Sequence, residues 1–311
     1  MTKLAFVFPG QGSQSIGMLA DLADRHPCVH ETFAEASAGA GADLWTISQS
    51  GPEALLNRTE YTQPCLLAAG IAVWRVWQNE RGAMPDLLAG HSLGEYSALV
   101  AANVVSLHDA AHLVRIRGQA MQDATPLGAG AMAAVIGAEE GLVEQVCAEV
   151  SGTHVVAPAN YNSPGQIVIG GHATAVDEAL ARLAALGVRK AVKLAVSVPS
   201  HTALMREAAN RLAEAMTAYR WSSPTLPVVQ NVDAQSRDDP AEICAALVRQ
   251  LYLPVRWSEC MQAVIARGAT RAGECGPGKV LTGLARRIDK SIDMRALGSA
   301  AELEDARAAW T

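Results

Sequence analysis

The sequence has few aromatic residues and no excess of positive charge. Phe, Trp and Tyr make up 5% of the 311 residues, and 31 acidic side chains outnumber 25 basic ones, which gives a net charge of −6. A protein that binds a nucleic acid backbone needs basic side chains to neutralise phosphates, so this balance argues against a nucleic acid partner. The apolar residues are mainly Ala, Val and Leu, which suits helices packed on a parallel sheet.

Metal-binding cysteine patterns and long apolar runs are also missing. The six cysteines form no C-x-x-C pair and no zinc-site spacing with histidine, so we expect reduced thiols and no metal ion. The apolar segment 64–77 is too short to span a bilayer and contains Arg75. The N-terminal apolar run is too short for a secretion signal. These features predict a cytoplasmic protein that does not enter a membrane.

Residues 85–100, PDLLAGHSLGEYSALV, contain the most informative motif. Leu87 to Ala89 is typical of a buried strand and residues 95–102 of a helix, so the G-x-S-x-G sequence from Gly90 to Gly94 makes the turn between them. Such a turn exposes the Ser92 hydroxyl and the backbone amide of Leu93. The simpler alternative is a Gly-Ser turn that only caps a helix. The position between strand and helix favours a nucleophile at Ser92.

A second turn follows the strand predicted at residues 4–8. Pro9-Gly10-Gln11-Gly12 permits close backbone approach, and loops at the carboxyl ends of sheet strands are where open α/β folds bind ligands. A plain tight turn is the alternative. The glycine spacing is not that of a dinucleotide-binding loop, and the later Gly-Pro-Gly-Lys at 276–279 lacks the spacing of a P-loop.

The helix predicted to begin after Ser106 and to end near Asp123 carries two arginines with different surroundings. Arg117 lies within the apolar sector of this helix, whereas Arg115 is predicted to lie opposite and to be solvated. A buried guanidinium needs a partner. The partner is either an internal carboxylate or the carboxylate of a substrate near Ser92, which a planar guanidinium can hold at two points.

A self-contained pattern between residues 126 and 197 predicts a small inserted domain. Strands are expected at 131–137, 155–159, 166–170 and 190–196, with helices at 139–150 and 173–187. The order βαββαβ is that of a ferredoxin-like α+β domain. Residues 160–165 are expected to form the loop between the middle strands. The rest, 1–125 and 198–311, is predicted to form a large α/β-hydrolase-like domain with a parallel sheet core.

The remaining sequence predicts further helices and strands of the large domain. Helices are expected at 13–39 with a break at Pro27, at 65–77, 202–217, 240–251 and 257–266, and from the turn at 275–279 through Arg287. Strands are expected at 226–229 and 271–274, the latter as the last strand. Residues 43–54 are predicted to be irregular, and those after Ile292 to be peripheral.

His201 is the histidine whose setting suggests chemistry. It follows Val198-Pro199-Ser200, where the chain re-enters the large domain at a helix start, so it could overhang a cleft between the domains. A lone histidine is more often a structural residue. His91 lies within the turn of Ser92 but is expected to point away.

Several separated stretches resemble one enzyme family. FVFPGQGSQ at 6–14, AGHSLGEYSALVAA at 89–102 and VPSH at 198–201 resemble the malonyl-CoA:acyl carrier protein transacylases of bacterial fatty acid synthesis, and more distantly the acyltransferase domains of polyketide synthases. Matches also occur at 61–64, 130–137, 162–172, 231–234, 247–257 and 276–284. The resemblance covers nearly the whole chain.

This resemblance implies a role for each candidate residue. It makes Ser92 the acylated nucleophile, His201 the general base and acid, and Arg117 the ligand of the malonyl carboxylate. It further implies an oxyanion hole from the backbone amides of Gln11 and Leu93, and a histidine oriented by the backbone carbonyl of Gln250. Asn160 and Asn162 match a loop that lines the acyl or coenzyme A side.

The resemblance also implies substrates and a partner. Malonyl-CoA donates the malonyl group, and the phosphopantetheine thiol of acyl carrier protein accepts it, so coenzyme A is part of a substrate and no cofactor is needed. Alternatives are a discrete acyltransferase of polyketide synthesis, or a serine hydrolase or thioesterase. Polyketide acyltransferases specific for malonyl often have a bulky aromatic residue where Ser200 stands, so tolerance for branched acyl groups stays open.

An acidic carrier protein would need a basic surface on this chain to dock against. We expect the protein to be a monomer. The candidates for that surface are Arg189, Lys190, Lys279, Arg286, Arg287 and Lys290.

Overall fold

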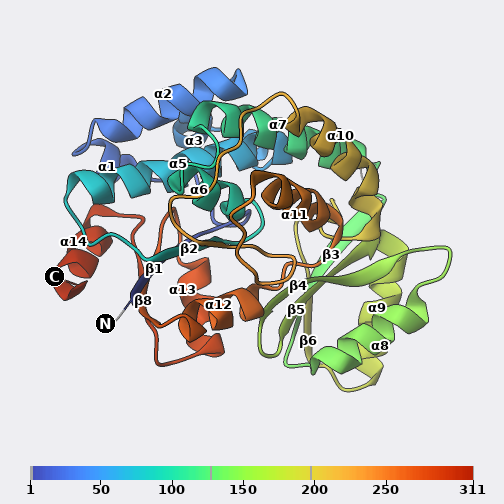
Figure 1. Cartoon of the computed structure of the whole chain (residues 1–311). Coiled ribbons are helices and arrows are strands. Elements are labelled where there is room, and N and C mark those ends of the chain that lie inside the picture. The colour runs from blue at the N-terminus through green and yellow to red at the C-terminus, as the bar shows by residue number, and fades with distance from the viewer. Residues whose placement is uncertain (1–2, 127, 197, 311) are drawn as a thin grey trace.

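The computed structural model describes residues 3–126, 128–196 and 198–310, which form two sheets with helices packed around them (Figure 1). The larger sheet has the strand order β7-β2-β1-β8-β9, and all of its pairings are parallel. The predicted parallel core is therefore confirmed. Its strands are β1 Lys3–Phe8, β2 Leu87–Gly90, β7 Val228–Val229, β8 Ala269–Glu274 and β9 Asp293–Ala296.

The register of the large sheet brings two predicted turns to one edge. Phe8 of β1 pairs with Gly90 of β2, and Val7 of β1 pairs with Glu274 of β8. The carboxyl ends of these strands are therefore level. The Pro9–Gly12 turn and the Ser92 turn start at this shared edge, which is where open α/β sheets bind ligands.

Alternate side chains of β1 enter two different cores. Phe6 and Phe8 pack in the larger core, and Ala5 and Val7 pack in the smaller core on the opposite face. The larger core is built with α2 Cys28–Ala40, α5 Thr59–Asn79, α6 Gly94–Ala101, α7 Leu107–Asp123, α10 Arg206–Met216 and α11 Pro240–Tyr252. The smaller core is built with α12 Trp257–Ala266 and α13 Val280–Ile288.

The smaller sheet is antiparallel throughout, with the strand order β4-β5-β3-β6. Along the chain its elements follow the expected order of strand, helix, strand, strand, helix, strand. In Figure 1, α8 and α9 cover the side of this sheet that faces away from the larger one. The elements are β3 Gly130–Ile136, α8 Glu140–Val150, β4 Val156–Ser163, β5 Gln166–His172, α9 Ala173–Ala185 and β6 Lys190–Lys193.

A short backbone contact ties the two parts together beside the candidate site. The Val255 amide donates to the Ala159 carbonyl at 2.9 Å, and the Tyr161 amide donates to the Val255 carbonyl at 2.8 Å. Strand β4 is thus joined to the segment that precedes α12, which holds one edge of the small sheet against the large part.

The prediction for residues 43–54 was wrong. They form α3 Leu44–Ser50 and the start of α4 Glu53–Leu56. The Asp43 carboxylate accepts a hydrogen bond from the Thr46 amide at 2.9 Å and so caps α3. The capping residue is a local sequence signal. The helix that follows it is too short to show the periodic apolar pattern from which a helix is predicted.

The prediction that the residues after Ile292 are peripheral was also wrong. Strand β9 adds to the large sheet, so β8 is not its last strand, and α14 Ala300–Trp310 follows. Trp310 is 4% exposed, and its ring centroid lies 5.7 Å from that of Trp77 in α5. This contact joins residues far apart in sequence, which local patterns do not reveal.

Three further boundaries differ from expectation. Residues 13–15 are irregular and residues 16–19 form a turn, with positive φ at Gly17 and Leu19, so the first helix is α1 Ala20–Ala23. Helix α5 begins at Thr59 rather than near Pro64. The helix expected at 202–217 begins as the 3-10 turn η1 Ala203–Met205 before α10.

The loop expected at residues 160–165 is mostly strand. Asn160 and Asn162 lie in β4, whose pairing with β5 is irregular between Pro158 and Asn160 and again between Tyr161 and Ser163, and Pro164-Gly165 alone forms the turn. Irregular pairing redirects side chains without ending a strand, so the polar sequence was mistaken for a loop. Over the described ranges, we find no helix with both the length and the apolar character that a bilayer crossing requires.

Candidate active site

Ser92 lies at a sharp turn between β2 and α6, as predicted. Its φ is 52°, a left-handed conformation that is uncommon for a residue with a side chain. Two glycines make the turn possible. A Cβ at Gly90 would lie 1.9 Å from the Gly94 carbonyl oxygen, and a Cβ at Gly94 would lie 2.0 Å from the Phe8 carbonyl oxygen. The turn is thus packed directly against the end of β1.

His201 is brought to the Ser92 hydroxyl. Its Nε2 lies 2.8 Å from Ser92 Oγ, and its Nδ1 lies 2.6 Å from the backbone carbonyl oxygen of Gln250. A carbonyl only accepts hydrogen bonds, so the proton is assigned to Nδ1, and Nε2 is free to accept the hydroxyl proton. His201 also has a positive φ of 62°, and its backbone amide donates to the Leu251 carbonyl at 3.0 Å.

The surroundings of His201 keep its imidazole neutral. The side chain is buried, with 3% exposure. Burial, followed by the charge of Arg117, lowers the pKa of His201 to about 3. A neutral imidazole that already faces a hydroxyl is equipped to take a proton from it.

Arg117 points into the interior, as predicted, and contacts the same serine. One terminal nitrogen donates to Gln63 Oε1 at 2.8 Å. The other donates to Gln250 Oε1 at 3.0 Å and to Ser92 Oγ at 3.3 Å. Within the described residues, the guanidinium makes no ion pair with a carboxylate. The internal ion pair left open by the sequence is therefore not found, and two neutral carboxamides hold Arg117.

The second arginine of α7 differs from its prediction. Arg115 is half-buried rather than solvated, and it donates to the backbone carbonyls of Ala40 and Gly41 at the end of α2. Its guanidinium also lies over the Tyr61 ring, 5.4 Å from the centroid. Arg115 thus joins helices, whereas Arg117 faces the reactive hydroxyl.

The backbone amides of Gln11 and Leu93 flank the serine without acceptors. Gln11 follows the end of β1 and borders the same cavity as Ser92, and Leu93 is the residue after the nucleophile candidate. In the described part of the chain, neither amide donates to a protein acceptor. Two such N–H groups beside a reactive hydroxyl can stabilise a developing oxyanion.

Ser92 and His201 open into a cavity of about 370 Å³ between the large part and the small sheet. Met132 and Asn160 of the small sheet and the segment 194–196 form the facing wall. Apolar and amide groups thus line the route to the hydroxyl. No group of three or more potential metal ligands occurs among residues 3–126, 128–196 and 198–310.

His91, which was expected to point away from the site, makes its ring contacts with Asn162 and Trp257. The residue borders this cavity, and its Nε2 lies 2.8 Å from Asn162 Oδ1. His91 therefore links the Ser92 turn to β4. This contact could not be predicted from the sequence, because only the folded small sheet places the Asn162 amide beside the turn.

Sequence reasoning did not identify three polar residues that support the site, Asn231, Gln63 and Glu95, nor the role of the Gln250 side chain. Asn231 accepts from the Ser92 amide at 2.7 Å and donates to the Gly90 carbonyl at 2.7 Å. Gln63 and the side chain of Gln250 hold Arg117, and Glu95 holds Gln250 at 2.9 Å. Only Glu95 and Asn231 had a signal in the sequence, which was their position: Glu95 follows the turn motif, and Asn231 follows a predicted strand.

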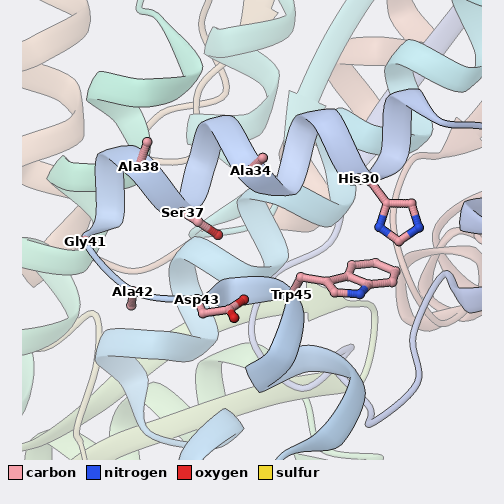
Figure 2. Close-up of a pocket in the computed structure, with 8 residues that line it drawn as sticks. All are labelled: His30, Ala34, Ser37, Ala38, Gly41, Ala42, Asp43 and Trp45. Carbon is pink, nitrogen blue, oxygen red and sulfur yellow. The ribbon is translucent and has the colours of Figure 1, made fainter.

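A second hollow lies on the surface between α2 and α3 and has a volume of about 680 Å³ (Figure 2). Figure 2 shows the His30 ring beside Trp45 and away from Ser37. The Ser37 hydroxyl accepts a hydrogen bond from the Leu44 amide, and Asp43 caps α3. The polar groups of this hollow thus hold the local backbone in place. Although it is larger than the cavity at Ser92, it contains no pairing of a nucleophile with a base.

Comparison with known proteins agrees with this geometry. Residues 5–293 match the family model described as acyl transferase domain. The malonyl CoA-acyl carrier protein transacylase of Salmonella typhimurium is 53% identical over 306 residues, covering 98% of this chain and 99% of the relative. The Escherichia coli K12 protein of the same name is 52% identical over 297 residues, covering 96% of each.

Solved structures give the same result. The crystal structure of malonyl-CoA:acyl carrier protein transacylase (FabD) from Xanthomonas oryzae pv. oryzae is 67% identical, with a TM-score of 0.99 over 100% of both chains. A malonyl-transacylase solved in complex with its type II PKS acyl-carrier protein is 49% identical, with a TM-score of 0.97 over 99% of this chain and 100% of that one. This chain therefore belongs to the acyl transferase domain family and, within it, to the malonyl CoA-acyl carrier protein transacylases.

Proposed function

We propose that this enzyme moves a malonyl group from malonyl-CoA to the phosphopantetheine thiol of acyl carrier protein, through a malonyl ester on Ser92, and so supplies fatty acid synthesis. The observation that carries the proposal is the convergence of two side chains on the hydroxyl oxygen of Ser92. Ser92 Oγ lies 2.8 Å from the imidazole of His201 and 3.3 Å from the guanidinium of Arg117. One group activates the hydroxyl, and the other is placed to bind a negatively charged acyl group.

In the first half-reaction, His201 Nε2 takes the hydroxyl proton as Ser92 Oγ attacks the thioester carbonyl of malonyl-CoA. The amides of Gln11 and Leu93 donate hydrogen bonds to the tetrahedral oxyanion. Each such donor stabilises the transition state by about 3 kcal/mol. The C–S bond then breaks, and coenzyme A leaves with the proton from the imidazole. The Gln250 carbonyl keeps the proton of Nδ1 in place during the cycle.

In the second half-reaction, the carrier protein thiol gives its proton to His201 Nε2 and attacks the malonyl ester. The tetrahedral intermediate collapses, the C–O bond breaks, and the proton returns to Ser92 Oγ. The reaction needs no redox step and no cofactor, since coenzyme A enters and leaves as part of a substrate. Product formation through one serine predicts ping-pong kinetics.

Arg117 selects acyl groups that end in a carboxylate. Gln63 and Gln250 satisfy guanidinium N–H groups without neutralising its charge. The carboxylate of a malonyl group neutralises the positive charge of the guanidinium. An acetyl group has no carboxylate and leaves that charge uncompensated in a buried site. The arrangement thus favours malonyl over acetyl.

The hydrolase alternative lacks the acid that would orient His201. Three aspartates lie between Ser92 and His201 in sequence. Asp123 pairs with Arg211 at 2.9 Å, and Asp177 pairs with Lys193 at 2.7 Å. The amide of Asp109 binds the capping hydroxyl of Ser106, and its carboxylate lies 3.3 Å from His108. None of these contacts reaches the imidazole, which instead meets a backbone carbonyl.

A role in polyketide synthesis is the second candidate, because the solved relative in complex with a type II PKS acyl-carrier protein is 49% identical. The carrier protein that the enzyme recognises decides between fatty acid synthesis and polyketide synthesis. The basic candidates for docking, Arg189, Lys190, Lys279, Arg286, Arg287 and Lys290, are all exposed. Lys279 already pairs with Glu302 at 2.6 Å, which weakens its candidacy.

The architecture supports a finer description of the domains. We infer a large α/β-hydrolase-like domain from residues 1–125 and 198–311, and a ferredoxin-like domain from residues 126–197. The parallel sheet supports the first, and the antiparallel order β4-β5-β3-β6 supports the second. Residue 197, where the small domain is drawn to end, lies outside the described residues. A monomer in the cytoplasm is the expected state, and all six cysteines are free thiols.

Mass spectrometry of the intact enzyme tests the function. Incubation with malonyl-CoA is expected to add one malonyl group on Ser92, and addition of holo acyl carrier protein is expected to remove it as malonyl-carrier protein. Ser92→Ala is the control and is expected to gain no adduct. Release of the adduct mainly as free malonate would reject transfer in favour of hydrolysis, and an adduct on Ser92→Ala would reject the nucleophile.

A further inference from the structure

Glu95 is a fully buried carboxylate that the mechanism does not use. It lies in the first turn of α6, three residues after Ser92, and its exposure is 0%. A buried charge destabilises the fold unless hydrogen bonds compensate for it. The identity of its hydrogen-bond donors therefore shows what it holds in place.

Three neutral N–H donors surround the Glu95 carboxylate. Oε2 accepts from the Asn231 amide at 2.8 Å and from Gln250 Nε2 at 2.9 Å, and Oε1 accepts from Gln230 Nε2 at 3.0 Å. Among the described residues, no basic side chain forms an ion pair with it. Burial raises the pKa of Glu95, whereas these donors and the charge of Arg117 lower it. Every contact uses the carboxylate as an acceptor, which suits the ionised form.

The contact with Gln250 fixes which end of its carboxamide faces Arg117. Gln250 Nε2 donates to Glu95 and also to the Ser92 carbonyl at 3.1 Å, so Oε1 is turned to the guanidinium at 3.0 Å. A flipped amide would put N–H groups against a cation and an oxygen against a carboxylate. Both contacts would be repulsive. The charge of Glu95 thus determines the orientation of the group that holds Arg117.

The contact with Asn231 acts on the serine side. Glu95 accepts a hydrogen bond from the backbone amide of Asn231. The Asn231 side chain accepts from the Ser92 amide and donates to the Gly90 carbonyl, both at 2.7 Å. The same carboxylate therefore supports the turn that presents Ser92. Glu95 touches neither Ser92 Oγ nor Arg117, so its effect on either is indirect.

We propose that Glu95 is a positioning residue for carboxylate recognition, because its carboxylate orients the Gln250 carboxamide toward Arg117 and fixes Asn231 beneath the Ser92 turn. The inference rests on the proposed function, since malonyl selection is the property it explains. A merely structural role would affect all acyl groups equally. A positioning role predicts a larger effect on substrates that contact Arg117.

Glu95→Gln tests this, because the variant keeps the shape but provides one acceptor oxygen for three donors. We expect the ratio of kcat/KM for malonyl-CoA to kcat/KM for acetyl-CoA to fall about tenfold or more, mainly through a higher KM for malonyl-CoA. Both rates are measured on one enzyme solution, so the ratio does not depend on the folded fraction. If Glu95→Gln does not fold, Glu95→Asp, which keeps the charge but shortens the reach, should lower the ratio in the same direction.

Glu274→Gln is the matched control. Glu274 is also a fully buried glutamate, but it caps α13 by accepting from the amides of Leu281 and Thr282 at 3.0 and 2.8 Å. Its loss should lower the melting temperature and leave the ratio unchanged. The proposal is overturned if malonyl and acetyl rates fall in parallel in the Glu95 variants, or if Glu274→Gln lowers the ratio equally. A wild-type enzyme without malonyl transfer would instead reject the proposed function.

Discussion

The two halves of the site are held in different ways. His201 is held mainly through the backbone, since its imidazole is oriented by the Gln250 carbonyl at 2.6 Å and its own amide donates to the Leu251 carbonyl at 3.0 Å. Arg117 is fixed by side chains, the carboxamides of Gln63 and Gln250. Backbone contacts survive substitution of the residues that make them, whereas side-chain contacts do not. The orientation of His201 should therefore tolerate changes in the residues that support it, and acyl selection should be sensitive to changes at Gln63 and Gln250.

Gln250 belongs to both halves and makes the distinction sharp. Its carbonyl meets His201, and its side chain meets Arg117 and Glu95. Gln250 thus orients His201 through an atom that every amino acid has, and it holds Arg117 and the Ser92 carbonyl through atoms that are particular to glutamine.

Replacing His201 breaks the reactive half and gives the largest expected effect. His201→Ala should lower kcat/KM by about 10³- to 10⁴-fold for malonyl-CoA and acetyl-CoA alike, since both need the hydroxyl proton removed. Stopped-flow release of coenzyme A measures the first half-reaction, and circular dichroism checks the fold. Activity within tenfold of wild type would mean that another group is the base.

The buried neutral imidazole predicts a smaller effect on stability. Burial lowers the pKa of His201 to about 3, whereas an unfolded histidine titrates near 6.5. Between these values the unfolded chain binds a proton that the folded chain does not, so the free energy of unfolding falls as the pH falls. This group contributes a slope of up to about 1.4 kcal/mol per pH unit.

His201→Gln removes that contribution and isolates it. Urea unfolding of both proteins from pH 7 to pH 4.5 should give a shallower loss of stability for the variant below about pH 6. The other titrating groups are common to both proteins and cancel in the comparison. Parallel curves would show that the imidazole is not held neutral.

The Ser92 turn and the inward position of Arg117 could be predicted from the sequence because their signals are local. The G-x-S-x-G turn specifies its own backbone, and the helical period of 107–123 places Arg117 inward before any tertiary contact is known. Ser106 caps that helix by accepting from the Asp109 amide at 3.0 Å, as its sequence suggests. The roles of Gln11, Leu93 and Gln250 needed the resemblance to a family, since nothing local marks them.

The partners that hold Arg117 could not be derived in the same way. Gln63 and Gln250 are 54 and 133 residues from Arg117 in sequence, and they meet it only after α5, α7 and α11 have packed. A glutamine within a helix has no local pattern that distinguishes a buried ligand from a surface residue. The choice between an internal ion pair and neutral partners for Arg117 therefore depended on tertiary structure.

The most direct test of this account replaces Arg117 and lets two acyl groups compete. Wild type and Arg117→Met are mixed with equal concentrations of malonyl-CoA and acetyl-CoA, and the adduct on Ser92 is read by mass spectrometry after a single turnover. We predict mostly malonyl-Ser92 in wild type, and a fall of about a hundredfold or more in the malonyl-to-acetyl ratio in Arg117→Met. A variant that keeps the wild-type ratio would contradict the claim that this guanidinium recognises the substrate carboxylate.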